Sequence, residues 1–209
     1  MKKKHTLAFA LTLAVGLTAA TACGIAAAET EALPEGYPLS GTIEDAVWFG
    51  DLQEFHATTL EGEAFTMDDL KAYDVTMINL WATWCGPCVA EMPDLARFEQ
   101  SVPENVRVIT CCIDYASEDE VAAVNEDAGY EGITLVGADG DLGEIMMSLE
   151  YIPTTLFFDS EGRAVGTGFI GGQEDFEAVY TEAIDSILTA MGKPEMAQTT
   201  EETESADVL

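Results

Sequence analysis

Two cysteines separated by two residues are the side chains in this sequence best suited to chemistry. Cys85 and Cys88 stand directly after an apolar run and at the start of a segment with helical character. Residues three apart share one face of a helix, so the two sulfur atoms can meet. The first turn of a helix offers unpaired N–H groups and the positive end of the helix dipole, which favour a thiolate at Cys85. The spacing therefore predicts a pair of thiols that forms and breaks a disulfide.

A Cys-x-x-Cys pair can also be half of a zinc site, which needs two further ligands. Cys111 and Cys112 are adjacent, and neighbours on a strand point to opposite faces, so they cannot easily complete one tetrahedron. Histidine occurs only at His5 and His56. We therefore expect no metal and no cofactor. For the adjacent cysteines we favour inert buried packing, with a second redox pair and a single electron-relay thiol as alternatives.

The charge balance excludes several kinds of partner. The 209 residues include 39 acidic and 8 basic side chains, a formal net charge of −31. Such a surface repels nucleic acid and anionic lipid headgroups. The apolar fraction of 48% is nevertheless large enough for one full hydrophobic core. We expect a monomeric globular domain with extensions and no nucleic-acid partner.

The amino terminus has the pattern of a secretory leader. A basic stretch, 1–5, precedes an apolar stretch, 6–20, which is short for a spanning helix. Small residues before Cys23 resemble a bacterial lipobox, in which that cysteine is lipidated and becomes the amino terminus. Cleavage after Ala28 is the alternative and would give a secreted protein. We favour a lipoprotein anchored to the outer face of the cytoplasmic membrane.

The rest of the chain divides by composition. We expect a signal peptide over 1–22, a tether over 23–49, a folded domain over 50–191 and a disordered acidic tail over 192–209. Apolar runs alternate with amphipathic segments inside the domain, which predicts an α/β fold with a mixed central sheet flanked by helices. The strands are expected at 54–58, 63–65, 75–82, 106–113, 133–136, 154–158 and 164–170, and the helices at 67–71, 86–100 (interrupted by Pro93), from 117, 142–149 and 176–191.

The longer string from Asn79 to Pro93, together with Ile152-Pro153-Thr154, resembles the thioredoxin superfamily. With the preceding hairpin it is similar to the TlpA/ResA branch of extracytoplasmic thiol–disulfide oxidoreductases. The resemblance implies a thioredoxin fold with an N-terminal β-hairpin extension. It also implies that Cys85 is the nucleophile, that Cys88 resolves the mixed disulfide, and that Pro153 is a cis-proline. The residues that it implies for substrate contact are Trp84, Gly86, Pro87, Ile152 and Pro153.

The same resemblance suggests a base and a biological role. Glu91, one turn beyond Cys88, matches a Glu of the TlpA/ResA branch, and Asn79 stands where thioredoxins have a buried, titrating Asp. We expect Glu91 to act as a buried base, the alternative being a solvated helix residue. The family implies a reductase of extracytoplasmic protein disulfides, with a CcdA/DsbD-like membrane electron donor and a role in redox homeostasis or cytochrome c maturation. An AhpC/TSA-type thiol peroxidase with antioxidant activity and a non-enzymatic copper chaperone are the alternatives.

Overall fold

The computed structural model describes residues 41–43, 49–114 and 117–196. The expected signal peptide, the expected lipidation site Cys23 and the alternative cleavage site after Ala28 lie outside these residues. Within them, no helix is long and apolar enough to cross a membrane.

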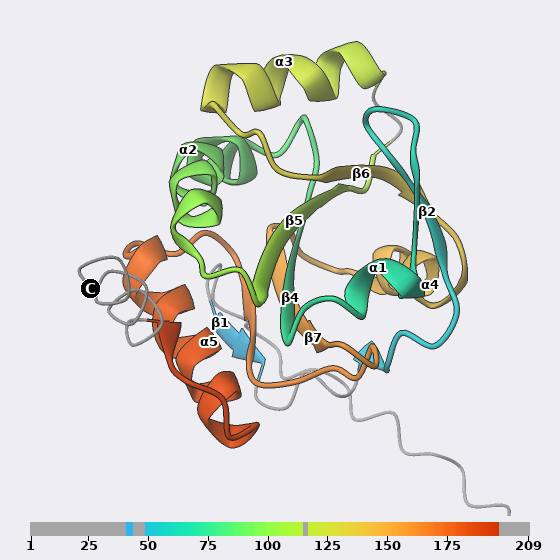
Figure 1. Ribbon diagram of the computed structural model, residues 1–209. Helices are drawn as coiled ribbons and strands as arrows, with labels where there is room; N and C mark the ends of the chain where they lie inside the picture. Colours follow the sequence, from blue (N-terminus) through green and yellow to red (C-terminus); the bar gives the residue numbers. More distant parts are fainter. Residues whose placement is uncertain (1–40, 44–48, 115–116, 197–209) are drawn as a thin grey trace, which may run out of the picture. The chain divides into compact units, whose positions relative to one another are not determined.

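One eight-stranded mixed sheet organises the domain (Figure 1). Its strand order is β1-β8-β7-β4-β5-β6-β2-β3, with β4, β5 and β6 parallel and the other pairs antiparallel. The mixed sheet that the sequence predicts is therefore confirmed. The strands are β1 (Gly41–Ile43), β2 (His56–Thr59), β3 (Ala64–Thr66), β4 (Val75–Trp81), β5 (Val106–Cys112), β6 (Thr134–Ala138), β7 (Thr154–Asp159) and β8 (Gly168–Ile170).

Strand β4 lies between β5 and β7 and is buried along its whole length. Its side chains alternate between two hydrophobic cores, as the pleat of a strand requires. Met77 and Trp81 pack in one core, and Ile78 and Leu80 in the other. A strand that is buried on both faces has a nearly continuous apolar sequence, and this pattern predicts β4 from the sequence.

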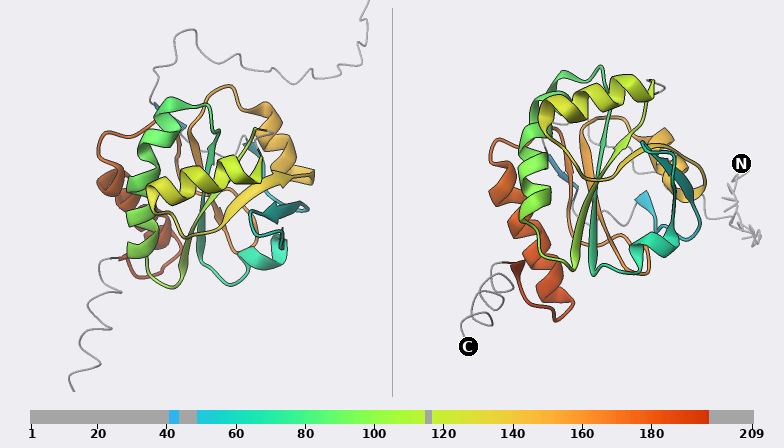
Figure 2. Two further views of the ribbon diagram at one scale, coloured as in Figure 1. Left: turned by 90° about the horizontal axis from the view of Figure 1, so that it is seen from above. Right: turned by 45° about the horizontal axis from the view of Figure 1, so that its top comes forward.

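The helices cover the two faces of the sheet (Figure 2). Buried side chains of α2, α3 and α5 share the core that contains Trp81, whereas those of α1 and α4 share the core that contains Leu80. Helix α3 begins after Ser117 as expected, where a capping box forms reciprocal hydrogen bonds between Ser117 and Glu120. The helices are α1 (Met67–Leu70), α2 (Gly86–Ser101), α3 (Glu118–Ala128), α4 (Gly140–Ser148) and α5 (Phe176–Ala190).

Helix α2 differs from its expected form, because it continues through Pro93 without interruption. A proline within a helix removes the hydrogen bond to the carbonyl four residues earlier, here that of Val89. Both residues are exposed, so water can replace the missing bond. Met92 and Leu95 are fully buried on the opposite face. Packing of that face against the sheet holds the helix together.

The predicted hairpin is confirmed and is joined to the main sheet. β2 and β3 pair antiparallel with Ala57 opposite Phe65, and β2 also pairs with β6. At the other edge, β1 lies within the expected tether and pairs with β8. Beyond the expected domain end at 191 the ordered chain continues, since Met196 is buried and its backbone N–H donates to Asp185 at 2.7 Å.

Candidate redox site

Cys85 and Cys88 form a disulfide, with an S–S distance of 2.08 Å. Cys85 is the N-cap of α2, and Pro87 occupies the first turn, where its missing N–H costs nothing. The backbone N–H of Cys88 donates to Cys85 Sγ at 3.3 Å. A short turn joins the end of β4 to this cap. In the turn, the Cys85 N–H donates to the Ala82 carbonyl at 3.0 Å. The strand-to-helix junction therefore holds both sulfurs at the positive end of a helix.

The Ile152–Pro153 peptide bond is cis, as the family resemblance implies. Strand β7 begins at the next residue and pairs antiparallel with β4, with Thr154 opposite Leu80. This register brings the cis peptide to the sheet end that bears the disulfide. The carbonyl oxygen of Ile152 lies 3.7 Å from Cys85 Sγ.

The residues expected to contact substrate surround the disulfide and differ in exposure. Trp84 is 72% exposed, Gly86 and Pro87 are exposed, Ile152 is half-buried and Pro153 is buried. The sulfurs themselves are covered, since Cys85 is 6% exposed and Cys88 is 1% exposed. Cys85 is therefore the sulfur that a partner can reach.

Glu91 lies on α2 three residues beyond Cys88 and is only 6% exposed, which contradicts the alternative of a solvated residue. Its Oε1 accepts a hydrogen bond from Asn79 Nδ2 at 3.0 Å. The same amide nitrogen donates to Thr155 Oγ1 at 3.1 Å, and that hydroxyl lies 3.0 Å from the hydroxyl of Tyr180. Asn79 thus uses both of its N–H bonds to link Glu91 to a buried hydroxyl pair.

Burial raises the pKa of Glu91 from 4.5 to about 7. The hydrogen bond from Asn79 favours the charged form and opposes this rise, while the nearby charge of Asp94 adds to it. The loop after β8 covers the carboxylate, since a Cβ on Gly172 would lie 3.4 Å from Oε2. A carboxylate that titrates near neutral pH is suited to accept a proton from a neighbouring thiol.

Asp114 is a part of the site that was not predicted from the sequence. Its Oδ2 accepts from the backbone N–H of Thr83 at 2.9 Å and from the Thr83 hydroxyl at 2.7 Å. Its Oδ1 accepts from Cys112 Sγ at 3.1 Å. Asp114 therefore positions the loop that carries Trp84 and Cys85. The sequence does hold a signal for this role, because Asp114 lies two residues after the end of β5 and the ends of neighbouring parallel strands meet at one edge of a sheet.

Cys111 and Cys112 are free and buried. They occupy different cores, so their side chains point to opposite faces as expected. Burial raises the pKa of each thiol to about 12, which leaves both protonated at neutral pH. This favours inert packing over a second nucleophile. Among the described residues, no group of three or more His, Cys, Asp or Glu side chains is arranged to hold a metal ion.

Sequence comparisons place this site in a family. The family model described as Redoxin matches residues 43–179. The thioredoxin-like protein YneN of Bacillus subtilis (strain 168) is 30% identical over 111 residues, which are 52% of this chain and 64% of the relative. The thiol-disulfide oxidoreductase ResA of Bacillus cereus (strain ZK / E33L) is 33% identical over 113 residues, 53% of this chain and 63% of the relative. The chain thus spans less than two thirds of the length of these relatives.

Solved structures share the fold. A DsbF homologue from Corynebacterium diphtheriae matches with a TM-score of 0.57 and 18% identity, covering 74% of this chain and 96% of that one. The exposed lipoprotein thioredoxin of Streptococcus pneumoniae strain TIGR4 matches with a TM-score of 0.51 and 24% identity, covering 63% and 98%. With a disulfide at a strand-to-helix junction opposite a cis-proline, the chain belongs to the Redoxin family and has a thioredoxin-like fold of the TlpA/ResA type.

Proposed function

We propose that the protein is a thiol–disulfide oxidoreductase that reduces disulfides in extracytoplasmic proteins. The observation that carries the proposal is the Cys85–Cys88 disulfide at the start of α2, with the Ile152 carbonyl 3.7 Å from Cys85 Sγ. The cis peptide and the exposed Trp84 lie beside this sulfur. This arrangement suits a substrate disulfide that is presented to Cys85 by an adjoining backbone.

In the first step, the thiolate of reduced Cys85 attacks one sulfur of the substrate disulfide. A bond forms between that sulfur and Cys85 Sγ, the substrate S–S bond breaks, and the released thiolate takes a proton from solvent. The N–H of Cys88 and the helix dipole favour the Cys85 thiolate that this attack needs.

In the second step, Cys88 gives its proton to Glu91 and attacks Cys85 Sγ. The Cys85–Cys88 bond forms, the bond to the substrate breaks, and the second substrate thiolate leaves and is protonated. Two electrons and two protons have then passed to the substrate. Glu91 suits the role of base because it lies one turn from Cys88, is buried, and has a pKa near 7.

A dithiol donor must reduce the disulfide again after each turnover, and we assign that part to a CcdA/DsbD-like membrane protein. The basic and apolar leader and the lipobox support anchoring of the chain through Cys23 at the outer face of the cytoplasmic membrane. Labelling of the protein in cells by a palmitate analogue should disappear in Cys23→Ala. Labelling that persists in the variant would refute lipidation at this cysteine.

The activity is tested by reduction of insulin disulfides in the presence of a small dithiol donor. The full chain should accelerate insulin precipitation well above the rate with the donor alone. Cys111→Ala is the matched control, because it removes a buried thiol that lies in the other core, and it should keep the wild-type rate. A wild-type protein that adds nothing to the donor's rate would disprove the proposed reductase.

A further inference from the structure

The disulfide lies in a part of the surface with an unusual composition, which we call the redox end. It comprises residues 82–92, 112–114, 117–120, 146–153 and 170–173. The large apolar side chains that are exposed among the described residues all lie there, and Trp84 and Met147 are the most exposed of them, at 72% and 82%. The full set is Trp84, Val89, Met147 and Tyr151. Two of them, Trp84 and Tyr151, are next to the disulfide and to the cis peptide in the sequence, where a substrate must bind.

The redox end contains no lysine or arginine. It does contain acidic side chains on the same surface, since Glu150 is exposed beside Tyr151 and three exposed acidic residues, 118–120, open α3. Two further acidic residues are less exposed, since Asp114 is half-buried and Glu91 is buried. The charged side chains of the redox end are therefore all acidic.

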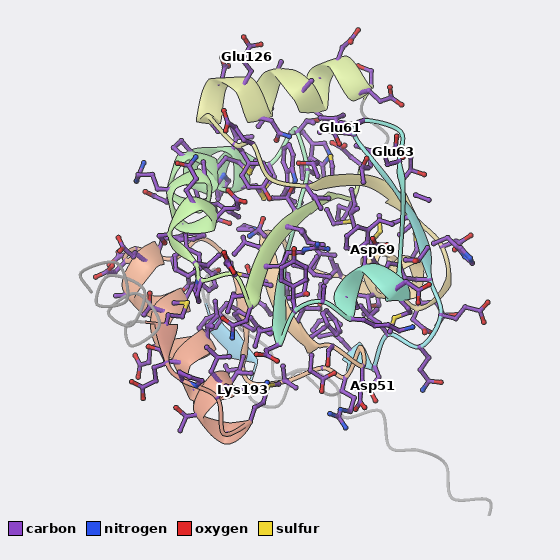
Figure 3. All side chains as sticks on the ribbon, viewed as in Figure 1. Asp51, Glu61, Glu63, Asp69, Glu126 and Lys193 are labelled. Atoms are coloured by element: carbon purple, nitrogen blue, oxygen red, sulfur yellow. A yellow bond between two sulfur atoms is a disulfide. The ribbon has the colours of Figure 1, made fainter. Side chains whose placement is uncertain are left out.

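Two of the basic side chains of the described residues lie at the opposite end of the sheet, where β4 begins. Lys193 pairs with Asp74, the residue before β4, at 2.9 Å. Arg163 pairs at 2.7 Å with Asp159, which lies opposite Val75 in the sheet. In Figure 3 the labelled Lys193 lies at the lower end, where β4 begins, whereas labelled acidic residues lie toward both ends.

The other basic residues are also remote or engaged. Arg107 lies at the start of β5, with its guanidinium 3.8 Å from the centre of the Tyr73 ring. Lys71 directly follows α1 and pairs with Asp68. Arg97 lies on α2 about 13 Å along the helix from Cys88, at 1.5 Å per residue, and pairs with a neighbouring aspartate. No cation of the described residues is thus placed to neutralise the redox end.

We propose that the redox end is a docking surface for positively charged, cysteine-bearing polypeptide segments. The proposal rests on the proposed reductase activity and names its substrate class. Apolar substrate side chains would contact Trp84 and Tyr151, while substrate lysines and arginines would face the acidic rim. A second copy of this chain is a poor occupant, because its net charge of −31 repels the same surface. Nucleic acid and anionic lipid are excluded by the same repulsion.

The test compares two synthetic disulfide peptides that differ only in lysine or glutamate beside each cysteine. With the full chain and a fixed dithiol donor, kcat/KM for the lysine peptide should exceed that for the glutamate peptide by about tenfold at about 20 mM salt. Most of the difference should lie in KM. At about 0.5 M salt, where screening is strong, the two values should converge to within about twofold.

Two variants that reverse the charge of one glutamate test whether the preference for the lysine peptide arises at the redox end. Glu150→Lys should lower the preference at low salt by about threefold, and Glu150→Gln by less. Glu104→Lys makes the same change of charge at an exposed position beside the start of β5 and should leave the preference unchanged. Equal rates for the two peptides at low salt, or equal effects of the two Lys variants, would overturn the docking proposal while leaving the reductase intact. Failure to reduce either peptide would refute the reductase itself.

Discussion

Cys85→Ser should lower insulin-disulfide reduction by at least about a thousandfold, to the rate of the donor alone. The thiolate at this position is the group that attacks the substrate, and a serine hydroxyl is a poor nucleophile at neutral pH. The substitution removes one sulfur from a helix cap that serine also favours, so the fold should persist. Circular dichroism of the reduced wild type and the variant should agree, which separates loss of chemistry from loss of structure.

Cys88→Ser should fail at a different step. Cys85 can still attack a substrate disulfide, but no second thiol is present to release the product. Mass spectrometry should therefore find a stable mixed disulfide between Cys85 and a substrate cysteine, one substrate per chain. In the cells that make the protein, the trapped partner would identify the physiological substrate. Turnover by this variant at the wild-type rate would remove Cys88 from the mechanism.

Glu91→Gln should slow release of the mixed disulfide without abolishing it. In the wild type the release rate should rise as the pH passes through about 7, because Glu91 must be ionised to accept the Cys88 proton. The variant should lose this rise and be slower by about a hundredfold at pH 8. Rapid mixing of reduced protein with a disulfide peptide measures the step. Glu61→Gln, exposed on the turn between β2 and β3, is the control and should keep the wild-type profile.

Glu91→Gln should slow the reaction but stabilise the folded protein relative to the wild type as the pH rises. Glu91 has a folded-state pKa near 7 and an unfolded-state value near 4.5, so the unfolded chain ionises first as the pH rises. Its favourable contribution is complete below pH 4.5 and is lost between 4.5 and 7. Glu91→Gln should therefore gain up to about 3 kcal/mol of unfolding free energy relative to wild type between pH 4 and pH 8. Denaturant unfolding at the two pH values measures the difference, and a constant difference would contradict a buried, titrating carboxylate.

Much of the site was predictable because its signals are local. The cysteine spacing, the apolar run before it and the proline in the first turn place the disulfide at a strand-to-helix junction. The capping box at Ser117 specifies the start of α3 through neighbouring residues. The cis peptide at Pro153 was predicted only from the family resemblance, because Pro153 lies far from Cys85 in the chain. In the structure, the carbonyl oxygen of the preceding residue, Ile152, lies 3.7 Å from Cys85 Sγ.

The features that were missed depend on contacts between distant segments. Strand β1 has only three residues, and it pairs with β8, which is far from it in the chain. Asp114 lies 31 residues from Thr83, and only the parallel pairing of β4 and β5 brings them together. The helix continues through Pro93 because the opposite face of α2 packs against the sheet, which a local rule for proline does not include.

The most direct test is a redox titration of the native protein against a dithiol/disulfide buffer, with free thiols alkylated and counted by mass spectrometry. We expect one two-electron transition, in which Cys85 and Cys88 become alkylated together while the buried Cys111 and Cys112 stay protected. A disulfide that stays closed across the titration until the protein unfolds would contradict a reversible redox pair.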